Sequence, residues 1–357
     1  MQLDQLLELI TTFFYSISQL FLIGKSNNVG FDHSPTPKLI DSDIYSNLFT
    51  YAHLIDISYC ISSISGIKEP FECDLACESR FPNVTLVYQW YYDDSVTGYI
   101  ATTYSNIFNY NDTNSAGGSE KKKKTIIVSL RGTRSIFDSY TDIKVDMTSY
   151  SNLNIHLPKC GTHCKVHQGF YDYYLHTLLN IHRILDKELV DASEDYELLI
   201  VGHSMGGSVA LLLALHYLDL GFDKLTVITM GQPLVGNKEF VNWVDLVMGS
   251  YNPPIHNSFS RKYFRVVHKD DIVATIPNSD GLLNQYSQFD NQIYLNCSSS
   301  TSMPSPKQVV DCVFGDNSKC IKRDFQGIRL IDYMSKDYFR SHNTYFRRLG
   351  MCGMKIK

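Results

Sequence analysis

LLIVGHSMGGSVALLLA, residues 198–214, changes its pattern halfway along. Residues 198–201 are a continuous apolar run, which is typical of a strand buried on both faces. Residues 208–218 are instead rich in the helix formers alanine and leucine. Between them lies the G-x-S-x-G pattern of a nucleophile elbow, with Ser204 at its centre. Its glycines remove Cβ atoms where strand and helix approach, so the serine can occupy a strained turn and present Oγ at the helix N-terminus.

Five letters alone are weak evidence, because a chain with 21 glycines contains such a pattern by chance fairly often. The chain has 357 residues, of which 44% are hydrophobic, and can therefore bury a large core. Its 32 basic and 37 acidic residues give a net charge of −5, which offers no basic surface for nucleic acid. We interpret the local exception, the run Lys121–Lys124, as a solvated loop tip, because it follows the polar residues 109–120.

The nine cysteines are many for a cytosolic enzyme, and they favour a secretory route. Their spacings suggest short disulfides within Cys73/Cys77, Cys160/Cys164 and Cys312/Cys320. Zinc is the alternative at residues 160–167, which include two histidines, but a C-x3-C spacing is tighter than the usual paired knuckles. The odd count leaves at least one thiol unpaired. Three N-x-S/T sequons also fit secretion, at Asn83, Asn111 and Asn296.

The N-terminal part predicts a leader over residues 1–24, a signal or anchor segment, and a linker over residues 25–40. Residues 13–23 are apolar like the core of a signal peptide, but Asp4 and Glu8 precede them, without a basic residue. No later segment has the ~20 uninterrupted apolar residues that a membrane span needs. We expect residues 41–357 to form a single domain.

Strand-like and helix-like segments alternate through this domain. We expect helices over residues 44–64, 170–189 and 208–218, and strands over residues 84–92, 98–104, 125–130, 198–201, 225–230 and 263–267. Gly221 lies where a helix-ending glycine belongs. Residues 284–323 are polar and serine-rich, and we expect an irregular tail that wraps the body. The alternation predicts an α/β fold with a mostly parallel sheet.

A serine nucleophile needs a histidine base, which α/β-hydrolases supply downstream, after the acid. Four histidines follow Ser204, and His342 is the last of them, in a segment that looks mobile. The others are less suitable, since His216 lies about three turns along the elbow helix, His256 lies in a proline-flanked loop and His268 ends a strand. We therefore expect His342 to be the base.

The acid is expected just past the strand over residues 263–267, because catalytic groups of open α/β sheets gather at the carboxyl ends of strands. Asp271 precedes two apolar residues that can dry its surroundings and strengthen its bond to an imidazole. Asp270 is the neighbouring alternative, and adjacency alone does not choose between the two. For the oxyanion, we expect the N–H of Met205 and a second donor at Thr133, where Gly132 permits close approach.

Several segments resemble the fungal class 3 lipases, most nearly the extracellular yeast lipases, and run in order from about residue 45 to 353. They are SLRGTRS (129–135), KVHQGFYDYY (165–174), VGHSMGG (201–207), MGQPLVGN (230–237), HKDDIVATIP (268–277) and the closing SHNTYF (341–346). The resemblance implies the α/β-hydrolase fold with a lid helix, with Ser204 as nucleophile, Asp271 as acid and His342 as base. It also implies Thr133 and Met205 as the oxyanion donors, and no metal or cofactor.

The resemblance further makes residues 134–147 a lid, whose apolar side Ile136, Phe137 and Tyr140 could supply. Opening such a lid exposes apolar area at a cost that a lipid surface can offset. The implied disulfides are Cys60–Cys352, Cys73–Cys77, Cys160–Cys164 and Cys312–Cys320, with Cys297 left as the free thiol. Two departures from the family are the methionine at position 205, where leucine is usual, and an inserted loop over residues 110–124.

These features predict a secreted, monomeric triacylglycerol lipase that acts at a lipid–water interface on acylglycerols. A phospholipase or a feruloyl-type esterase on the same scaffold is the nearest alternative. A non-catalytic lipid-binding protein is a further one, which the complete triad disfavours.

Overall fold

A computed structural model gives the fold of most of the chain. It describes residues 36–92, 97–108, 123–133, 146–192, 195–250, 261–277, 286–290, 292–298, 301, 303–312, 314–315, 317, 319–320 and 340–352. The expected leader, the lid residues Ile136, Phe137 and Tyr140, and the sequon at Asn111 lie outside these residues.

The described residues contain one nine-stranded sheet and one two-stranded sheet. From edge to edge, the large sheet consists of β1 (Lys38–Leu39), β11 (Val309–Asp311), β10 (Ile293–Leu295), β9 (Tyr263–His268), β8 (Leu225–Met230), β7 (Tyr196–His203), β4 (Lys124–Arg131), β3 (Thr97–Thr103) and β2 (Thr85–Trp90). The small sheet pairs β5 (Met147–Ser149) with β6 (Lys165–His167). β4, β7, β8, β9 and β10 pair in parallel, whereas the flanking strands pair antiparallel. The expected α/β fold with a mostly parallel sheet is confirmed.

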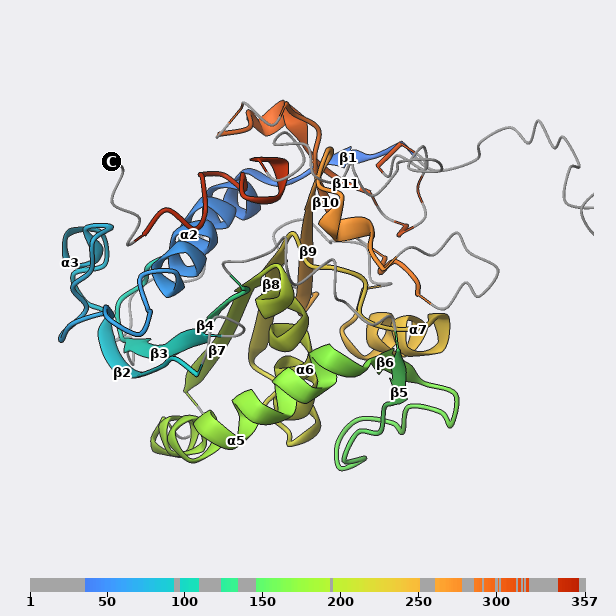
Figure 1. Cartoon of the computed structure of the whole chain (residues 1–357), viewed down its shortest axis with the longest axis horizontal. Helices are drawn as coiled ribbons and strands as arrows, with labels where there is room; N and C mark the ends of the chain where they lie inside the picture. The colour runs from blue at the N-terminus through green and yellow to red at the C-terminus, as the bar shows by residue number, and fades with distance from the viewer. Residues whose placement is uncertain are drawn as a thin grey trace, which may run out of the picture. The chain divides into compact units, whose positions relative to one another are not determined.

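Helices cover both faces of the large sheet (Figure 1). They are α2 (Ser42–Ser58), α3 (Cys77–Arg80), α5 (Gln168–Asp191), α6 (Met205–Asp219) and α7 (Lys238–Val247), with short 3-10 turns η1 (Val273–Thr275) and η2 (Pro306–Gln308). Leu199 and Val201 of β7 pack on the side of α2, whereas Leu198 and Ile200 pack on the side of α5 and α6. Both faces of the strand are therefore buried, which explains its unbroken apolar run. None of the described helices is both long and apolar enough to cross a membrane.

Three sequence interpretations need correction. The segment over residues 284–323 is not simply an irregular tail, because β10 and β11 within it extend the sheet. The end of the expected linker also joins the sheet, as β1 pairs with β11. Lys124 is not part of a solvated tip: it is buried at the start of β4, with Nζ 2.7 Å from a carboxylate oxygen of Glu188 on α5.

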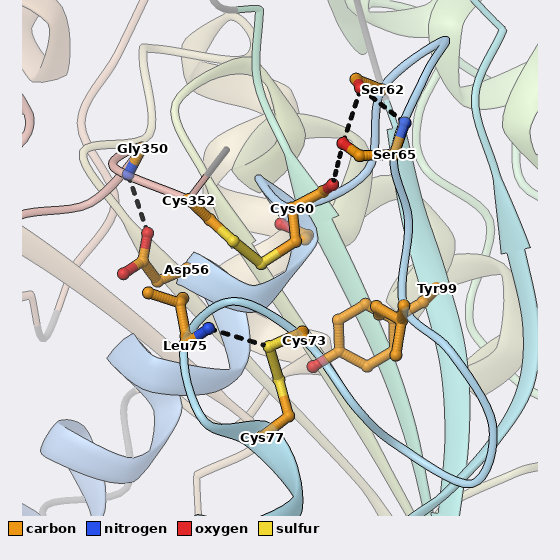
Figure 2. The surroundings of a disulfide bond; sticks show 12 residues. Asp56, Cys60, Ser62, Ser65, Cys73, Leu75, Cys77, Tyr99, Gly350 and Cys352 are labelled. Carbon is orange, nitrogen blue, oxygen red and sulfur yellow. Dashed lines mark hydrogen bonds between the residues drawn. A yellow bond between two sulfur atoms is a disulfide. The ribbon is translucent and has the colours of Figure 1, made fainter. Parts of the chain in front are cut away.

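Four disulfides are present, and they are the four pairs that the resemblance implied. Cys60–Cys352 joins residues 292 positions apart, and so ties the C-terminal segment to the end of α2 (Figure 2). Asp56 of α2 reinforces this attachment, since its carboxylate accepts a hydrogen bond from the N–H of Gly350 at 2.8 Å and pairs with Arg347 at 2.8 Å. The segment over residues 340–352 is thereby fixed to the body of the protein.

Candidate active site

Ser204 lies at the junction of β7 and α6 in a backbone conformation that side chains rarely adopt, with φ 56° and ψ −133°. The flanking glycines are required by close approach of the backbone. A Cβ atom at Gly202 would lie 2.4 Å from the carbonyl oxygen of Gly206, and one at Gly206 would lie 2.6 Å from the backbone of Arg131. The elbow therefore depends on residues without side chains at both positions.

His342 and Asp271 form a buried pair. Nδ1 of His342 lies 3.0 Å and 2.9 Å from the two carboxylate oxygens of Asp271, and both side chains are about fully buried. Burial by itself would raise the pKa of Asp271, but His342 and the hydrogen bonds to the carboxylate hold that pKa below its ordinary value. The carboxylate is thus ionised and orients the imidazole. Nε2 of His342 is buried and makes no hydrogen bond to any described residue, so this nitrogen is available to accept a proton.

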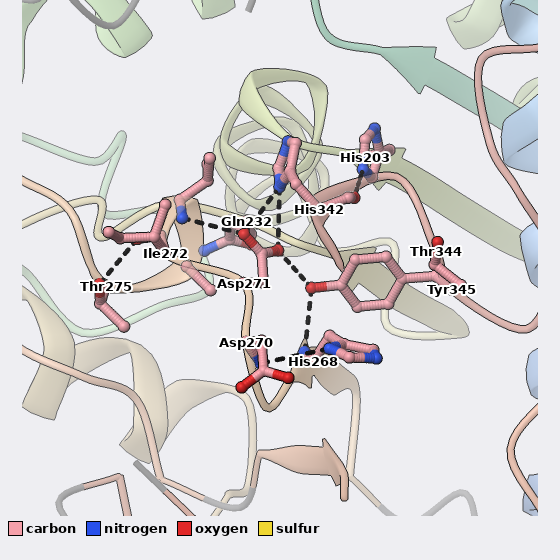
Figure 3. A network of polar contacts seen from close by, with 12 residues as sticks. His203, Gln232, His268, Asp270, Asp271, Ile272, Thr275, His342, Thr344 and Tyr345 are labelled. Atoms are coloured by element: carbon pink, nitrogen blue, oxygen red, sulfur yellow. Dashed lines mark hydrogen bonds and ion pairs between the residues drawn. The ribbon is translucent and has the colours of Figure 1, made fainter. Parts of the chain in front are cut away.

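Tyr345 is a further member of this group that sequence reasoning missed. Its hydroxyl donates a hydrogen bond of 2.5 Å to Asp271 and accepts one of 3.0 Å from the N–H of His268 (Figure 3). The N–H of Val273 donates to the other carboxylate oxygen at 2.9 Å. Asp271 is therefore held from three sides, by His342, Tyr345 and the turn that follows it. The adjacent Asp270 is only half-buried, and its N–H donates to Nδ1 of His268 at 3.2 Å.

The topology explains why these groups meet. Ser204 follows β7, Gly231 follows β8 and Asp271 comes shortly after β9, and these three strands are parallel neighbours. Gly231 has φ +60°, and its Cα packs against the pair: a Cβ there would lie 2.9 Å from Asp271 Oδ2 and 3.0 Å from His342 Cε1. The absence of a side chain at Gly231 therefore leaves the space that the imidazole ring of His342 occupies.

The expected oxyanion donors lie at the same end of the sheet. Gly132, just after β4, packs against the elbow, since a Cβ there would lie 2.9 Å from Ser204 Cβ and 3.2 Å from the nitrogen of Met205. Thr133 comes next and is buried, as is Met205. Gly132, the residue before Thr133, therefore lies against both Ser204 and Met205, while the lid residues lie outside the described part.

The other candidates lie elsewhere or have other contacts. His216 lies on α6 beside the hydroxyl of Tyr174, at 3.2 Å. His268 accepts a hydrogen bond from the N–H of Asp270, and its Nε2 lies 3.4 Å from the buried free thiol of Cys297. His256 is outside the described residues. In the described part of the chain, no group of three metal-ligating side chains occurs, and the cysteines of the alternative zinc site form a disulfide.

Comparisons with known proteins agree with this fold. The class 3 lipase family matches residues 127–281. The crystal structure of Lip2 lipase from Yarrowia lipolytica is 31% identical and superimposes with a TM-score of 0.71, over 90% of this chain and 99% of that one. A secreted mono- and diacylglycerol lipase 2 of Gibberella zeae is 29% identical over 361 residues, covering 89% of this chain and 84% of the relative. A lipase from Rhizopus microsporus var. chinensis, 22% identical, shares the fold with a TM-score of 0.61, over 91% and 95% of the two chains. The chain belongs to the class 3 lipase family, and it is accordingly a carboxylic-ester hydrolase.

Proposed function

We propose that this chain is a secreted triacylglycerol lipase in which Ser204 is the nucleophile, His342 the base and Asp271 the acid that orients it. The observation that supports this most is the buried His342–Asp271 pair, which lies where the strands after the elbow end. An ionised carboxylate paired with an imidazole whose second nitrogen is available is the arrangement that activates a serine hydroxyl.

The reaction follows the acyl-enzyme route. His342 Nε2 takes the proton of Ser204 as Oγ attacks the ester carbonyl, and the oxygen of that carbonyl becomes negative between Met205 N–H and Thr133. The imidazolium then gives its proton to the leaving glycerol oxygen, which breaks the ester bond and leaves the acyl group on Ser204. A water molecule repeats the sequence with His342 as base, and releases the fatty acid and the free serine. Asp271 stays ionised and stabilises the imidazolium in both halves.

Secretion is proposed on three grounds. The four disulfides form and persist in oxidising compartments. The Gibberella relative is described as secreted. The sequons at Asn83 and Asn296 lie on exposed residues, which suits glycosylation on that route.

The acylglycerol substrate distinguishes this proposal from its nearest alternatives. The Gibberella relative is named for mono- and diacylglycerols, so the three acylglycerol classes should be compared directly. The test measures fatty-acid release from emulsified trioleoylglycerol, dioleoylglycerol, monooleoylglycerol and a phosphatidylcholine, below and above the concentration at which each substrate forms an interface. We expect trioleoylglycerol to be hydrolysed, with a rate that rises once an interface forms.

The controls are Ser204→Ala and Ser208→Ala, the second of which removes a buried serine hydroxyl one turn further along α6. Only the first should abolish hydrolysis. Fatty-acid release from phosphatidylcholine alone would indicate a phospholipase on the same scaffold. Equal rates on soluble and interfacial esters would indicate an esterase.

A further inference from the structure

His203, the elbow residue before Ser204, contacts the segment that carries His342. Its Nε2 is 2.8 Å from the backbone carbonyl oxygen of His342, and its Nδ1 is 2.5 Å from the hydroxyl of Tyr59. The two imidazole rings are 4.7 Å apart, and Figure 3 shows His203 beside the backbone of His342. His203 is fully buried, so water does not compete for either nitrogen.

These contacts fix the tautomer of His203. A carbonyl oxygen only accepts hydrogen bonds, so Nε2 of His203 carries the hydrogen and donates it to His342. Nδ1 is then the acceptor, and the hydroxyl of Tyr59 is the donor. Without that hydroxyl, Nδ1 would be left buried without its donor, and the His203 ring would lose one of the two hydrogen bonds that fix its orientation. Tyr59 therefore helps to hold the His203 ring in the orientation that binds the His342 carbonyl.

The charge of His203 is also controlled. Burial, followed by the nearby His342, lowers the pKa of His203 to about 3. His203 thus stays neutral when His342 gains a proton during the reaction, and the hydrogen bond between them persists through the catalytic cycle. A second protonated imidazole at this distance would oppose the formation of the imidazolium.

From this geometry we infer that His203 and Tyr59 are positioning residues, which set the place of the His342 ring relative to Ser204. His203 is bonded covalently to Ser204 and by hydrogen bond to the residue that carries the base, so it joins the two directly. Tyr59 adjoins Cys60, whose disulfide holds the far end of the same C-terminal segment. The segment that carries His342 is thereby held at His342 by His203 and at Cys352 by the disulfide. This inference rests on the proposed roles of Ser204 and His342.

The test compares three variants with a matched control. His203→Leu removes the donor, and His203→Gln keeps an amide N–H that can reach the same carbonyl. Tyr59→Phe removes only the hydroxyl. Tyr99→Phe is the control, because it removes an equally buried hydroxyl that donates 2.9 Å to the carbonyl of Leu54, away from the His342 segment.

The measurements are the rate at which a fluorophosphonate modifies Ser204, kcat and KM for a soluble ester, and the melting temperature. We expect His203→Leu and Tyr59→Phe to lower the labelling rate and kcat about tenfold with KM unchanged, by the same factor from about pH 5 to 9. His203→Gln should recover most of the rate. Tyr99→Phe should lower the melting temperature about as much as Tyr59→Phe, but leave labelling at the wild-type rate.

Two results separate this inference from the proposed function. If wild-type protein is labelled on Ser204 but His203→Leu and Tyr59→Phe are labelled equally fast, the positioning role is wrong and the triad stands. If the wild type is not labelled on Ser204, the proposed function itself fails. Should His203→Leu not fold, Tyr59→Phe decides the matter, because it removes a single oxygen atom.

Discussion

Replacing Gly231 by alanine should lower kcat about tenfold in addition to destabilising the fold. Gly231 has φ +60°, a conformation that costs an L side chain roughly 1–2 kcal/mol. Alanine also restricts the unfolded chain, which offsets part of that cost, so we expect a net loss of about 1 kcal/mol in the free energy of unfolding. The new Cβ would lie 2.9 Å from the Asp271 carboxylate and 3.0 Å from the His342 ring.

The effect on the rate follows from how far Asp271 and His342 must move away from the new Cβ. Ordinary contacts begin near 3.4 Å, so the His342–Asp271 pair must move by about half an ångström. A misplacement of about 1 Å costs roughly a hundredfold in rate, and half of it therefore costs about tenfold. Neither partner can move freely, because both are buried and hydrogen-bonded.

Gly221→Ala is the matched control. Gly221 also has positive φ, +99°, and a Cβ there would lie 2.9 Å from the ring of His156. It lies about 20 Å from the elbow, past the far end of α6. Chemical denaturation should show similar losses of stability in both variants. Ester hydrolysis should show a tenfold loss of kcat only in Gly231→Ala. Equal kcat values in the two variants would refute the packing argument.

Three further predictions concern stability, each measured by chemical denaturation. Lys124→Ala should cost about 2–4 kcal/mol because it breaks a buried ion pair, and the half-exposed Lys123→Ala less than about 1 kcal/mol; equal losses would contradict this. Burial raises the pKa of Asp245 to about 7. Stability should therefore fall from pH 4 to 7, because over this range the carboxyl ionises only in the unfolded state. Asp245→Asn should flatten this fall and raise the free energy of unfolding by about 1–3 kcal/mol at pH 8. A steeper fall of stability with pH in Asp245→Asn than in the wild type would contradict this prediction. Replacing Cys60 and Cys352 by serine should cost roughly 3–5 kcal/mol and lower activity, and unchanged activity would show that the disulfide does not help to hold the C-terminal segment.

The sequence was most informative where local pattern and tertiary role coincide. β8 has the bounds that its apolar run predicts, and β7 and α6 extend their predicted segments by a few residues. Ser204 could be found because an elbow needs small residues at fixed spacing around the serine. His342 could be favoured over the other histidines because the order of such groups along the chain follows from the topology, whereas only the resemblance to the family favoured Asp271 over Asp270.

Other features depend on contacts that no local pattern reveals. β10 and β11 have three residues each, too few to show a period, and form because they pair with neighbouring strands. A run of four lysines does not show that Lys124 meets a carboxylate on α5. Tyr345 and His203 are ordinary residues in sequence, and their importance comes from hydrogen bonds to partners more than 70 positions away.

The central claim is that Ser204 is the nucleophile of a triad with His342 and Asp271. It is tested most directly by treating the intact protein with a fluorophosphonate and locating the adduct by mass spectrometry of its peptides. We predict one adduct per chain, on Ser204, with labelling slowed at least about a thousandfold in His342→Ala. An adduct on another residue, or long-chain ester hydrolysis that persists in Ser204→Ala, would contradict the account.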